Sequence, residues 1–395
     1  MHIGMFGPVE ISSFYSFLDN VSRESCVNEP SVNAPAPSAL AMELLRRGHR
    51  VTLVTYSTRR PPLRLSGDRL SIVRVRGYRP RDEILGGWKH AIAEMAGEMR
   101  LARPDVVHAH WTYEFALAAV RSGRPSVVTV RDAPISVLRY EPDLYRLCRF
   151  AMAVAFRLRM KSAKIALAAV SPYMARAWKK EMRDYRELLV LPNVSLMDEV
   201  RTAALKSPTP VVVELASAAS RKNVRTLITA FARVRAAIPD AELRLFGHGL
   251  TEDGELARAA AHSGEAQGVR FMGHADRAQS QAELRRAWVH AHLSLEESFG
   301  NTLIEAMQVG TAVLAGENSG AVPWVLGDGE GGLLVDATDP AAVARALTAL
   351  LSSPEKRDEL VAGAYRVLAD RHSTNAVVDA HLRVYRSLAV PTVDQ

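Results

Sequence analysis

Two glutamates, eight residues apart, offer the clearest chemistry in this chain of 395 residues. Glu297 and Glu305 lie in the stretch Glu296–Gly310, EESFGNTLIEAMQVG, which follows the apolar run Ala291–Leu295. Each carboxylate oxygen can accept a hydrogen bond from one of the vicinal hydroxyls of a sugar or ribose. Between the two glutamates, Gly300 allows a ligand to approach the backbone closely. The spacing therefore suits a ligand rich in hydroxyl groups, although two solvated glutamates on a surface helix would share it.

The residues around these glutamates predict a strand, a turn, a helix and a second strand. We expect the first strand over Ala291–Leu295 and the helix over Thr302–Val309, with Asn301 or Thr302 as its cap. Gly310 ends the helix, and the apolar run AVLAG follows. The turn then lies at the carboxyl end of a strand, where open α/β sheets bind ligands. Free amides in the first helical turn favour phosphate oxygens, so a ligand made of a diphosphate and a sugar fits both features.

Short apolar strands alternate with helical stretches along the whole chain. This pattern is typical of the α/β class with doubly wound parallel sheets, and 395 residues are enough for two domains. In the N-terminal half the predicted strands are HIGMF, VTLVTY, LSIVRVRG, DVVHAH, SVVTV and IALAAV. Between the first of these strands and the first helix, the segment from Gly7 to about Pro37 is rich in Pro, Ser and Asn. We expect a long loop there, either a functional lid or a mobile segment.

Charge is distributed unevenly between the two halves of the chain. Residues 1–195 hold 30 Lys and Arg against 18 Asp and Glu, whereas the remainder hold 20 against 25, which together give the net charge of +7. No helix-turn-helix, RNP or zinc pattern accompanies the basic half, so we expect no nucleic-acid partner. An anionic membrane or a lipid-phosphate acceptor suits such a surface, and a solvated basic face is the simpler alternative.

Cysteine usage and the apolar runs bear on the compartment. Cys26 and Cys148 are the two cysteines and form no CxxC motif, which indicates a reducing compartment and no structural zinc. The first residues, MHIGMF, predict a strand and not a signal peptide. The apolar run Cys148–Phe156 contains an arginine and is too short to cross a bilayer. We therefore expect a cytoplasmic protein, either soluble or peripheral on the inner face of the membrane.

A long amphipathic helix with a basic face is predicted over Tyr140–Lys164. Apolar residues recur in it at helical spacing, namely Leu147, Phe150, Ala151, Val154 and Leu158. Its basic residues are Arg146, Arg149, Arg157, Arg159, Lys161 and Lys164. Two interpretations stay open for this helix: it packs on the core with one solvated side, or it makes a weak contact with an anionic membrane.

The segment Glu297–Ala306, ESFGNTLIEA, resembles the Glu-x7-Glu motif of the retaining glycosyltransferases of family 4. As in that family, a strand of small residues and a Gly-rich turn follow it, TAVLAGENSGAVP. The resemblance extends over most of the chain and implies the GT-B fold, in which two Rossmann-like domains face each other across a cleft. It implies an acceptor-binding domain over residues 1–200 and a nucleotide-sugar-binding domain over 201–372. Residues 373–395 would form a helix that crosses back to the first domain.

The resemblance also implies a reaction. A sugar would pass from a nucleotide-diphosphate donor, of UDP or GDP type, to a hydroxyl of a sugar, lipid-linked or small-molecule acceptor, with retention at the anomeric carbon. Such a transfer would serve polysaccharide, glycolipid or glycoconjugate biosynthesis. We expect no cofactor and no metal, because no Asp-x-Asp pair accompanies a nucleotide-binding turn, and a lysine and helix amides can offset the diphosphate charge. The alternatives are an inactive sugar-nucleotide-binding partner subunit, or a sugar-nucleotide epimerase or phosphorylase of the same architecture.

Donor contacts are carried over from the family onto matching residues. Glu297 would hold hydroxyls of the donor sugar, Glu305 the ribose, and Lys222 the diphosphate. Further donor contacts are expected from Phe299, Gly300, Asn301, Thr302, Arg221, Gly247 and Gly7.

The chain departs from the family pattern at two positions. Relatives read Val-His-Asp where this chain has Arg131 before Asp132, and they carry an arginine where this chain has Ser217. Arg131, Asp132 and His110 would be the contribution of the first domain to the reacting site, although His110 can equally be a buried core histidine. Either the site has decayed or a cation has been relocated. We predict relocation, to Arg131 or to Arg221.

Overall fold

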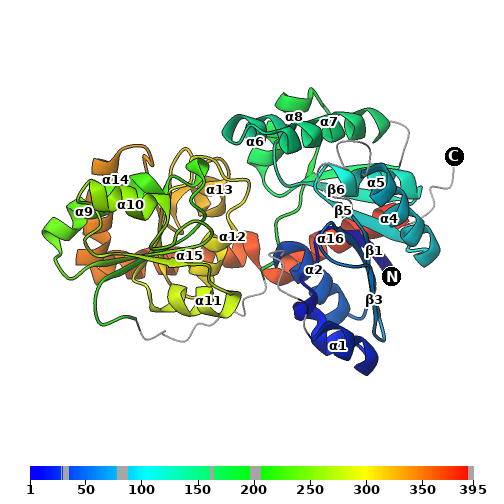
Figure 1. Ribbon diagram of the computed structural model, residues 1–395, viewed down its shortest axis with the longest axis horizontal. Helices are drawn as coiled ribbons and strands as arrows, with labels where there is room; N and C mark the ends of the chain where they lie inside the picture. Colours follow the sequence, from blue (N-terminus) through cyan, green and yellow to red (C-terminus); the bar gives the residue numbers. More distant parts are fainter. Residues whose placement is uncertain (28, 30–34, 78–87, 161–163, 196–205, 390–395) are drawn as a thin grey trace. The chain divides into compact units, whose positions relative to one another are not determined.

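The computed structural model describes residues 1–27, 29, 35–77, 88–160, 164–195 and 206–389 (Figure 1). The chain forms two compact units. Unit 1 comprises Met1–Leu196 and Thr374–Gln395, and unit 2 comprises Met197–Ser373. The predicted boundaries after residues 200 and 372 lie close to these divisions.

Unit 1 is built on an eight-stranded sheet in the order β3-β4-β2-β1-β5-β6-β7-β8. All neighbouring strands pair in parallel, except that β3 and β4 pair antiparallel at one edge. The chain runs outward from β1 to β2 and β4 and then returns to place β5 beside β1, so the strand order reverses between β1 and β5. Sheets of this kind bind ligands at such a topological switch point. The strands are β1 (His2–Phe6), β2 (Arg50–Ser57), β3 (Leu63–Ser66), β4 (Leu70–Arg76), β5 (Val106–His110), β6 (Ser126–Val130), β7 (Ile165–Ala169) and β8 (Leu189–Val190).

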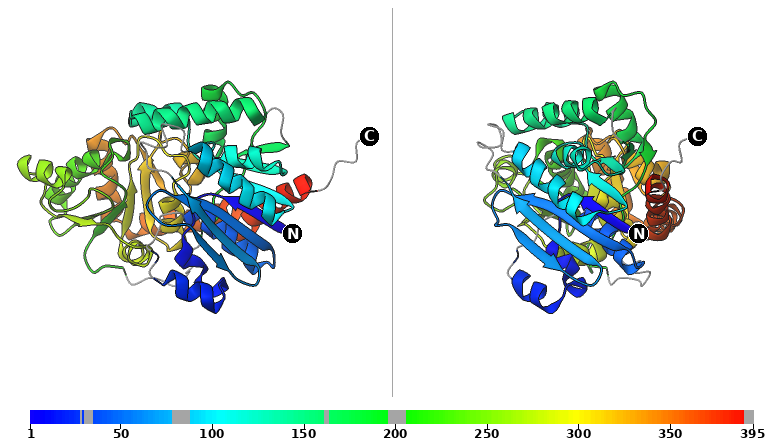
Figure 2. Two further views of the ribbon diagram at one scale, coloured as in Figure 1. Left: turned by 45° about the vertical axis from the view of Figure 1, so that its right-hand side comes forward. Right: turned by 90° about the vertical axis from the view of Figure 1, so that its right-hand side faces the viewer.

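Helices cover both faces of the sheet of unit 1 (Figures 1 and 2). The helical segments are η1 (Ile11–Phe17), α1 (Asn20–Cys26), α2 (Pro35–Arg46), α4 (Trp88–Ala102), α5 (Glu114–Ser122), α6 (Pro134–Tyr140), α7 (Leu144–Arg159), α8 (Pro172–Met182) and α16 (Thr374–Ala389). On one face α5 contacts both α4 and α7, and on the other α2 contacts α16. The last helix, α16, brings Val378 and Tyr385 into the same core cluster as Ile3 of β1, so it completes the core of the N-terminal sheet.

Unit 2 is built on a six-stranded parallel sheet in the order β11-β10-β9-β12-β13-β14. Its strands are β9 (Val211–Leu215), β10 (Glu242–Phe246), β11 (Val269–Gly273), β12 (Val289–His292), β13 (Ala312–Gly316) and β14 (Leu333–Val335). The chain proceeds from β9 to β10 and β11 in one direction and resumes with β12 on the other side of β9. The switch point of this unit therefore lies between β9 and β12. The predicted α/β class with two doubly wound parallel sheets is confirmed.

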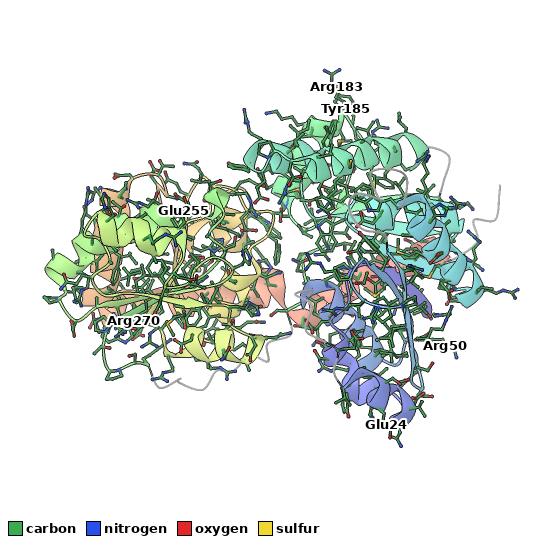
Figure 3. The ribbon with its side chains drawn as sticks, in the orientation of Figure 1. Glu24, Arg50, Arg183, Tyr185, Glu255 and Arg270 are labelled. Atoms are coloured by element: carbon green, nitrogen blue, oxygen red, sulfur yellow. The ribbon has the colours of Figure 1, made fainter. Side chains whose placement is uncertain are left out.

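The helices of unit 2 also form two layers. They are η4 (Ser220–Lys222), α9 (Val224–Ala237), α10 (Glu255–His262), α11 (Arg277–Arg286), α12 (Asn301–Gln308), α13 (Val322–Val325), η5 (Gly327–Gly329), α14 (Pro340–Ser352), α15 (Pro354–Val367) and η6 (Leu368–His372). Helix α14 contacts α9 on one side, while α12 contacts α11 and α15 on the other. Charged side chains point outward from the ribbon, as Figure 3 shows for Glu24 and Arg183. Within the described residues, no helix combines the length and apolar composition needed to span a bilayer.

The segment from Gly7 to about Pro37 is not the long loop that we expected. Its described part contains η1 and α1, and Phe14 of η1 is fully buried in the core. Asp19 caps α1 by accepting a hydrogen bond from the backbone N–H of Ser22. The prediction was wrong because several of these Ser and Asn residues lie inside the short helices η1 and α1, where tertiary packing outweighs their weak helix propensity.

The helix predicted over Tyr140–Lys164 is interrupted. Helix α6 ends at Tyr140 and α7 begins at Leu144, where Asp143 accepts a hydrogen bond from the N–H of Arg146 and so caps a new helix. Lys164 lies just before β7, and Lys161 lies outside the described residues.

The predicted apolar stripe of this helix is largely exposed, although Phe150 and Val154 in it are half-buried. Leu147 and Leu158 are 50% and 64% exposed, whereas Met152, Ala153 and Phe156 form the buried side. Helix α7 thus carries two apolar stripes, and only the second packs on the core of unit 1.

Candidate functional site

The predicted donor residues gather at the switch point of unit 2, in the segments that follow β9 and β12. Strand β12 runs from Val289 to His292, so the strand predicted over Ala291–Leu295 begins two residues and ends three residues too late. The backbone leaves the sheet after His292 because the peptide groups of Leu293 and Leu295 have hydrogen-bond partners outside the sheet. The side chain of Asn223 donates to the carbonyl of Leu293 (3.1 Å), and the N–H of Leu295 donates to the carbonyl of Arg221 (2.8 Å). These bonds hold the segment after β12 against the segment after β9.

Glu297 and Lys222 form a largely buried ion pair at this point. The Nζ of Lys222 lies 2.7 Å from Oε2 of Glu297, and their side chains are only 19% and 12% exposed. Nη1 of Arg221 donates to the carbonyl of Glu296 (2.7 Å) and lies 4.0 Å from the same Glu297 oxygen. Burial opposes ionisation of Glu297, but Lys222 and His292 outweigh it and hold its pKa well below the ordinary value. The site therefore presents a fixed negative charge with two cations beside it.

A histidine that the sequence analysis did not single out lies behind this pair. His292 is fully buried at the end of β12. Its Nε2 is 3.4 Å from Glu297 and its Nδ1 is 3.5 Å from Glu214, distances typical of an ion pair. Burial works against a charge on His292, yet the two carboxylates prevail and raise its pKa above the ordinary value. His292 thus lies between two carboxylates and supports Glu297 from within the core. The two histidines of VHAH, in an otherwise apolar strand, were the sequence signal from which His292 could have been identified.

Glu305 has the opposite environment. It lies one turn into α12 and is half-buried. Its carboxylate forms no hydrogen bond or ion pair with the described residues. Burial raises its pKa to about 7, and only the field of Arg277 opposes this. A carboxylate that the protein leaves without a partner at a switch point is suited to accept hydrogen bonds from a ligand.

The start of α12 differs from the prediction. Asn301 is the first helical residue and Gly300 is the N-cap, so the expected cap by Asn301 or Thr302 is wrong. Gly300 has a left-handed backbone (φ +89°), and an added Cβ would lie 2.7 Å from a methyl carbon of Leu303. No side chain caps this N-terminus. The N-terminus of α12 thus keeps its partial positive charge, which favours an anion.

Two predicted donor residues beside this turn are mainly enclosed. Phe299 is 3% exposed, and its ring packs on Trp324 and edge-on against His372. Its contribution is to hold the turn in place. The hydroxyl of Thr302 is buried and has no hydrogen-bond partner among the described residues.

Asn223 organises the switch point, and the sequence analysis missed it. It adopts a left-handed backbone (φ +55°), which asparagine tolerates, and it is the N-cap residue of α9. Its side-chain amide donates both to Leu293 and to the carbonyl of Ala337 (2.8 Å). One side chain thereby links three segments of unit 2. Its partners lie 70 and 114 residues away, so no local pattern could reveal this role.

Gly247 shapes the neighbouring loop. Its φ is +137°, and an added Cβ would lie only 1.5 Å from the carbonyl oxygen of Ala216. The N–H of Ala216 donates to the carbonyl of Phe246, and that of Ala218 to the carbonyl of His248, both over 2.9 Å. Glycine is therefore required because the end of β10 packs directly against the backbone around Ser217.

The remaining predicted residues cluster in unit 1. Arg131 donates from Nη2 to Nδ1 of His110 (2.9 Å) and from Nη1 to the side-chain oxygen of Asn193. Its guanidinium also lies over the ring of Trp111, 5.4 Å from the centroid. Burial lowers the pKa of Arg131 to about 10, which leaves it charged at neutral pH. Its guanidinium is thus engaged within its own unit.

His110 lies beside Gly7, where an added Cβ would come within 3.2 Å of the imidazole. Nε2 of His110 is buried without a hydrogen-bond partner among the described residues, unlike the neighbouring His108, which meets both Thr129 and Tyr385. Asp132 accepts a hydrogen bond from Tyr113 (2.8 Å). In the described part of the chain, no group of three or more His, Cys, Asp and Glu residues is arranged to hold a metal ion.

Comparison with known families matches almost the whole chain. Residues 198–367 match the family model for glycosyl transferases group 1, and residues 38–194 match the model for glycosyltransferase family 4.

Individual relatives match over shorter stretches. The chain is 31% identical over 212 residues to lipopolysaccharide core biosynthesis glycosyltransferase LpsE of Rhizobium meliloti, which covers 53% of this chain and 59% of that protein. It is 37% identical over 170 residues to phosphatidyl-myo-inositol mannosyltransferase of Mycobacterium leprae, covering 43% and 44%. The chain thus spans about half the length of the curated relatives it matches.

Solved structures resemble the chain over nearly its full length. Sucrose-phosphate synthase from Thermosynechococcus elongatus aligns with a TM-score of 0.75 and 18% identity over 98% of both chains. WaaG, a glycosyltransferase involved in lipopolysaccharide biosynthesis, aligns with a TM-score of 0.67 and 15% identity over 98% of this chain and 99% of that one. At such identities these likenesses show the fold.

Proposed function

Because the chain belongs to the group 1 and family 4 glycosyltransferases, we propose that it transfers a sugar from a nucleotide-diphosphate sugar to an acceptor hydroxyl. One observation carries the proposal beyond family membership. At the switch point of unit 2, a fixed carboxylate, two cations, a carboxylate without a partner and an uncapped helix N-terminus converge. Each of these groups matches one part of such a donor.

The donor would occupy this site in a defined orientation. Glu305 would accept hydrogen bonds from the ribose hydroxyls, and Glu297 from hydroxyls of the transferred sugar. Lys222, Arg221 and the first amides of α12 would bind the diphosphate between them. A UDP or GDP donor is proposed; structures of the same fold have been solved with UDP and glucose, and with UDP-2-fluoro glucose.

Catalysis would rest on positioning and on stabilising the departing diphosphate. Negative charge grows on the diphosphate as the glycosidic bond to the donor breaks, so cations held in place beforehand stabilise the transition state. Lys222 can share its three donors between Glu297 and a phosphate oxygen. Retention at the anomeric carbon is proposed from family membership, and neither glutamate has to act as a nucleophile.

We also propose that the reaction needs no metal ion. Lys222, Arg221 and the amides of α12 supply the positive charge that a metal would otherwise give to a diphosphate. Assays with and without EDTA check this, and full activity is expected in its presence. Activity that EDTA abolishes and magnesium or manganese restores would contradict it.

The acceptor is proposed to be a saccharide or a lipid-linked polyol, as the names of the two relatives suggest. A peripheral membrane contact fits this proposal. The exposed stripe of α7 places Leu147 and Leu158 on the same helix as the exposed Arg159, a combination that suits an anionic bilayer surface.

Thermal-shift measurements with UDP, GDP, ADP and their sugars test the donor site, because a ligand that binds the folded state raises the melting temperature. One nucleotide series is expected to stabilise the protein and Glu305→Ala to lose that stabilisation. Product analysis then separates the activities: free nucleotide with a new glycoside indicates transfer, an isomerised donor indicates an epimerase, and binding without turnover indicates an inactive subunit.

A further inference from the structure

Glu214 is a buried carboxylate to which the described residues donate no hydrogen bond. It lies in β9, is 1% exposed, and neither of its carboxylate oxygens has a hydrogen-bond partner in the described part of the chain. A charge buried in a protein is normally paired and hydrogen-bonded, so such a group calls for a physical reason. The one contact at ion-pair distance that the described residues give it is to Nδ1 of His292, 3.5 Å away.

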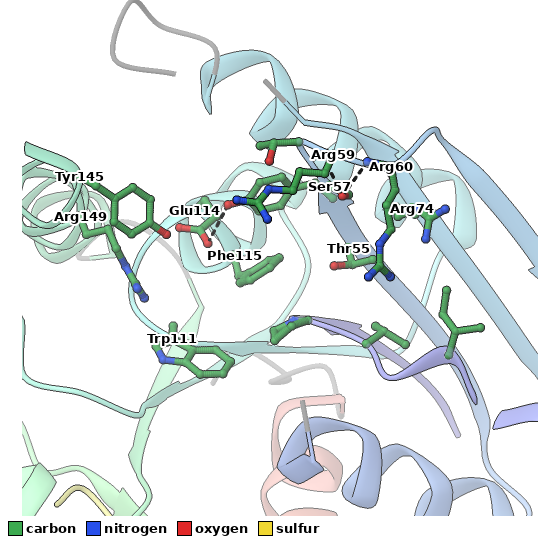
Figure 4. A pocket seen from close by; sticks show the side chains of 15 residues that line it. Thr55, Ser57, Arg59, Arg60, Arg74, Trp111, Glu114, Phe115, Tyr145 and Arg149 are labelled. Atoms are coloured by element: carbon green, nitrogen blue, oxygen red, sulfur yellow. Dashed lines mark hydrogen bonds between the residues drawn. The ribbon is translucent and has the colours of Figure 1, made fainter. Parts of the chain in front are cut away.

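The switch point of unit 1 shows how the same chain accommodates another buried glutamate. A cavity of about 490 Å³ opens there, and its lining includes Glu114, Arg59, Arg60, Arg74 and Arg149 (Figure 4). Glu114 accepts a hydrogen bond from Tyr56 (3.3 Å), and the charge of Arg149 favours its ionised form. Glu214 has no such support within the described residues, since no arginine or lysine among them lies within ion-pair distance of it. His292 is the group placed to compensate Glu214.

His292 connects Glu214 to the ion pair of the donor site. Its Nε2 lies 3.4 Å from Oε2 of Glu297, the same oxygen that Nζ of Lys222 meets at 2.7 Å. The contacts of His292 are longer than good hydrogen bonds, but an imidazole protonated on both nitrogens can donate to a carboxylate on either side. Glu214, His292, Glu297 and Lys222 thus form a charge network in which acidic and basic groups alternate.

The second histidine of β12 does not share this role. The ring of His290 lies 5.8 Å from that of His292, centroid to centroid, and it too is within the field of Glu214. However, Nδ1 of His290 meets the carbonyl of Val213 (3.1 Å), and burial lowers the pKa of His290 to about 4. His290 is therefore neutral at physiological pH, and His292 is the histidine that can carry a proton in this network.

The charged groups on the other side of His292 come from the segments after β9 and β12. Lys222 opposes a proton on His292, whereas Glu297 favours one. Arg221 lies 3.9 Å from Glu296 and 4.0 Å from Glu297, at the far side of the ion pair. Burial also opposes the charge, but the carboxylates prevail and raise the pKa of His292.

Binding of a diphosphate alters the balance of this network. In the proposed function, Lys222 shares its positive charge between Glu297 and a phosphate oxygen. Glu297 then loses part of its countercharge, and a largely buried carboxylate with too little countercharge is strongly destabilising. His292 meets the same oxygen of Glu297 from the core, where no ligand competes for it.

We propose that His292 is a positioning residue of the donor site, which holds a proton against Glu297 as Lys222 turns toward the diphosphate. Glu214 orients the imidazole from the opposite side. Where His292 is neutral in the free protein, the proton comes from the solvent, so the proton and the diphosphate each favour the binding of the other. His292 itself touches no part of the donor. The inference deepens the proposed function and rests on it, because it requires a diphosphate beside Lys222.

Calorimetry on the full chain tests the inference, because binding heats in buffers with different heats of ionisation give the number of protons taken up. The probes are UDP, GDP and ADP, and each is compared with its nucleoside, which lacks the diphosphate. Measurements between pH 8 and pH 9.5 avoid other contributions, since Glu305 and the terminal phosphate, with pKa values of about 7 and about 6, are already ionised there. The diphosphate that binds is expected to bring an uptake of up to about one proton per site, and its nucleoside none.

Variants assign this proton to His292. His292→Gln is expected to abolish the uptake and to weaken the diphosphate by about tenfold. The affinity for the nucleoside should stay unchanged, which shows that the site is folded. Glu214→Gln should move the uptake to lower pH, because His292 loses one of the carboxylates that favour its proton. His290→Gln is the matched control and should keep both the uptake and the affinity of the unchanged protein.

The possible outcomes separate this inference from the proposed function. A diphosphate that binds the unchanged protein without proton uptake anywhere in this pH range overturns the inference, and this result does not depend on whether His292→Gln folds. Uptake that persists in a folded His292→Gln also overturns it. In both cases the binding itself leaves the proposed donor site standing. If none of the three diphosphates binds, the proposed donor site is contradicted and the inference falls with it.

Discussion

Two glutamates of the same motif are held in opposite states by their surroundings. Glu297 is paired with Lys222 and flanked by His292, and these neighbours hold its pKa well below the ordinary value despite burial. Glu305 has no partner among the described residues and a raised pKa. This difference indicates different tasks: Glu297 is part of a fixed charge network, whereas Glu305 is completed by the ligand.

Nucleotide affinity is expected to depend on pH through Glu305. Its pKa is about 7 in the free protein, and only the ionised form accepts hydrogen bonds from both ribose hydroxyls. The affinity should therefore be close to its maximum at pH 8. It should fall by about tenfold at pH 6, where Glu305 is ionised in about one molecule in ten. Calorimetry with the nucleoside diphosphate over this range measures the effect.

Two variants control this measurement. Glu305→Gln should bind more weakly, by about 1–3 kcal/mol, and should lose the pH dependence, because the amide does not titrate. Glu255→Gln changes an exposed glutamate of α10 and should leave both affinity and pH dependence as they were. A pH dependence that persists in Glu305→Gln would assign it to another group.

The stability of unit 2 is expected to depend on pH through His292. Its pKa in the folded protein is raised above that of the unfolded chain, so its charge stabilises the fold below about pH 6.5, the ordinary pKa of histidine. This contribution is lost as the pH rises through the folded pKa. Each unit of upward shift corresponds to about 1.4 kcal/mol. The free energy of unfolding should therefore be lower at pH 9 than at pH 6, and His292→Gln should abolish this difference.

His290 supplies the matched control. It lies two residues away, is equally buried and donates to the carbonyl of Val213 (3.1 Å), but burial lowers its pKa to about 4. His290→Gln should therefore keep the decline in stability between pH 6 and pH 9. The same slope in His292→Gln and in the unchanged protein would remove His292 from the charge network.

At the scale of elements, the sequence was informative where an element is buried on both sides. Strands of a parallel sheet are covered by helices on both faces, so β1, β5, β9 and β13 are short, mainly apolar runs that can be recognised without context. The edge strands β3 and β8 lack this signal, since they are only four and two residues long and partly exposed. They were missed for that reason.

Helix α7 shows what periodicity cannot decide. Leu147 and Leu158 recur at helical spacing, but so do Met152 and Phe156, and only the fold determines which stripe meets the core. The residues of the candidate site likewise fall into two groups, those that the local sequence reveals and those that only the fold reveals. The motif residues around Glu297 could be predicted from local sequence, whereas Asn223 and, through Glu214, His292 acquire their roles from partners distant in the chain.

The exposed stripe of α7 is expected to bind anionic vesicles weakly. Each basic residue close to such a surface contributes about 1 kcal/mol and is screened by salt within a Debye length of about 10 Å at 0.1 M. Sedimentation should show binding to vesicles containing anionic lipid, less to neutral vesicles, and a loss on addition of salt. Replacing Leu147 and Leu158 together by Asp should abolish it.

A matched variant guards against a general effect of added charge. Leu101 is 79% exposed at the end of α4 in the same unit, and Leu101→Asp should bind vesicles as the unchanged protein does. Equal binding to neutral and anionic vesicles would argue against an electrostatic contact through α7.

At the scale of the whole molecule, each unit has one switch point and the two carry different chemistry. Unit 1 presents a cavity with surplus arginine, consistent with the excess of 30 basic over 18 acidic residues in its part of the sequence up to residue 195. Unit 2 presents paired carboxylates with two cations, in the acidic part of the chain.

The two departures from the family pattern, Arg131 in unit 1 and Ser217 in unit 2, can be tested for coupling between the units. The missing cation at Ser217 had two candidate replacements. Arg221 lies 4.0 Å from Glu297, in the segment that contains Lys222, whereas the guanidinium of Arg131 is bonded to His110 and Asn193 within its own unit. We therefore expect Arg221 to replace the absent arginine.

Double-mutant cycles distinguish the two candidates, because residues that share a function give non-additive effects and independent residues give additive ones. Arg221→Lys should lower turnover, since the planar fork is lost while the charge remains, and Ser217→Arg should restore much of it. The coupling between positions 217 and 221 should be about 0.5–3 kcal/mol. Combining Ser217→Arg with Arg131→Lys should instead give additive changes. Coupling between 217 and 131, with none between 217 and 221, would mean that the cation comes from unit 1 and that donor binding links the two units.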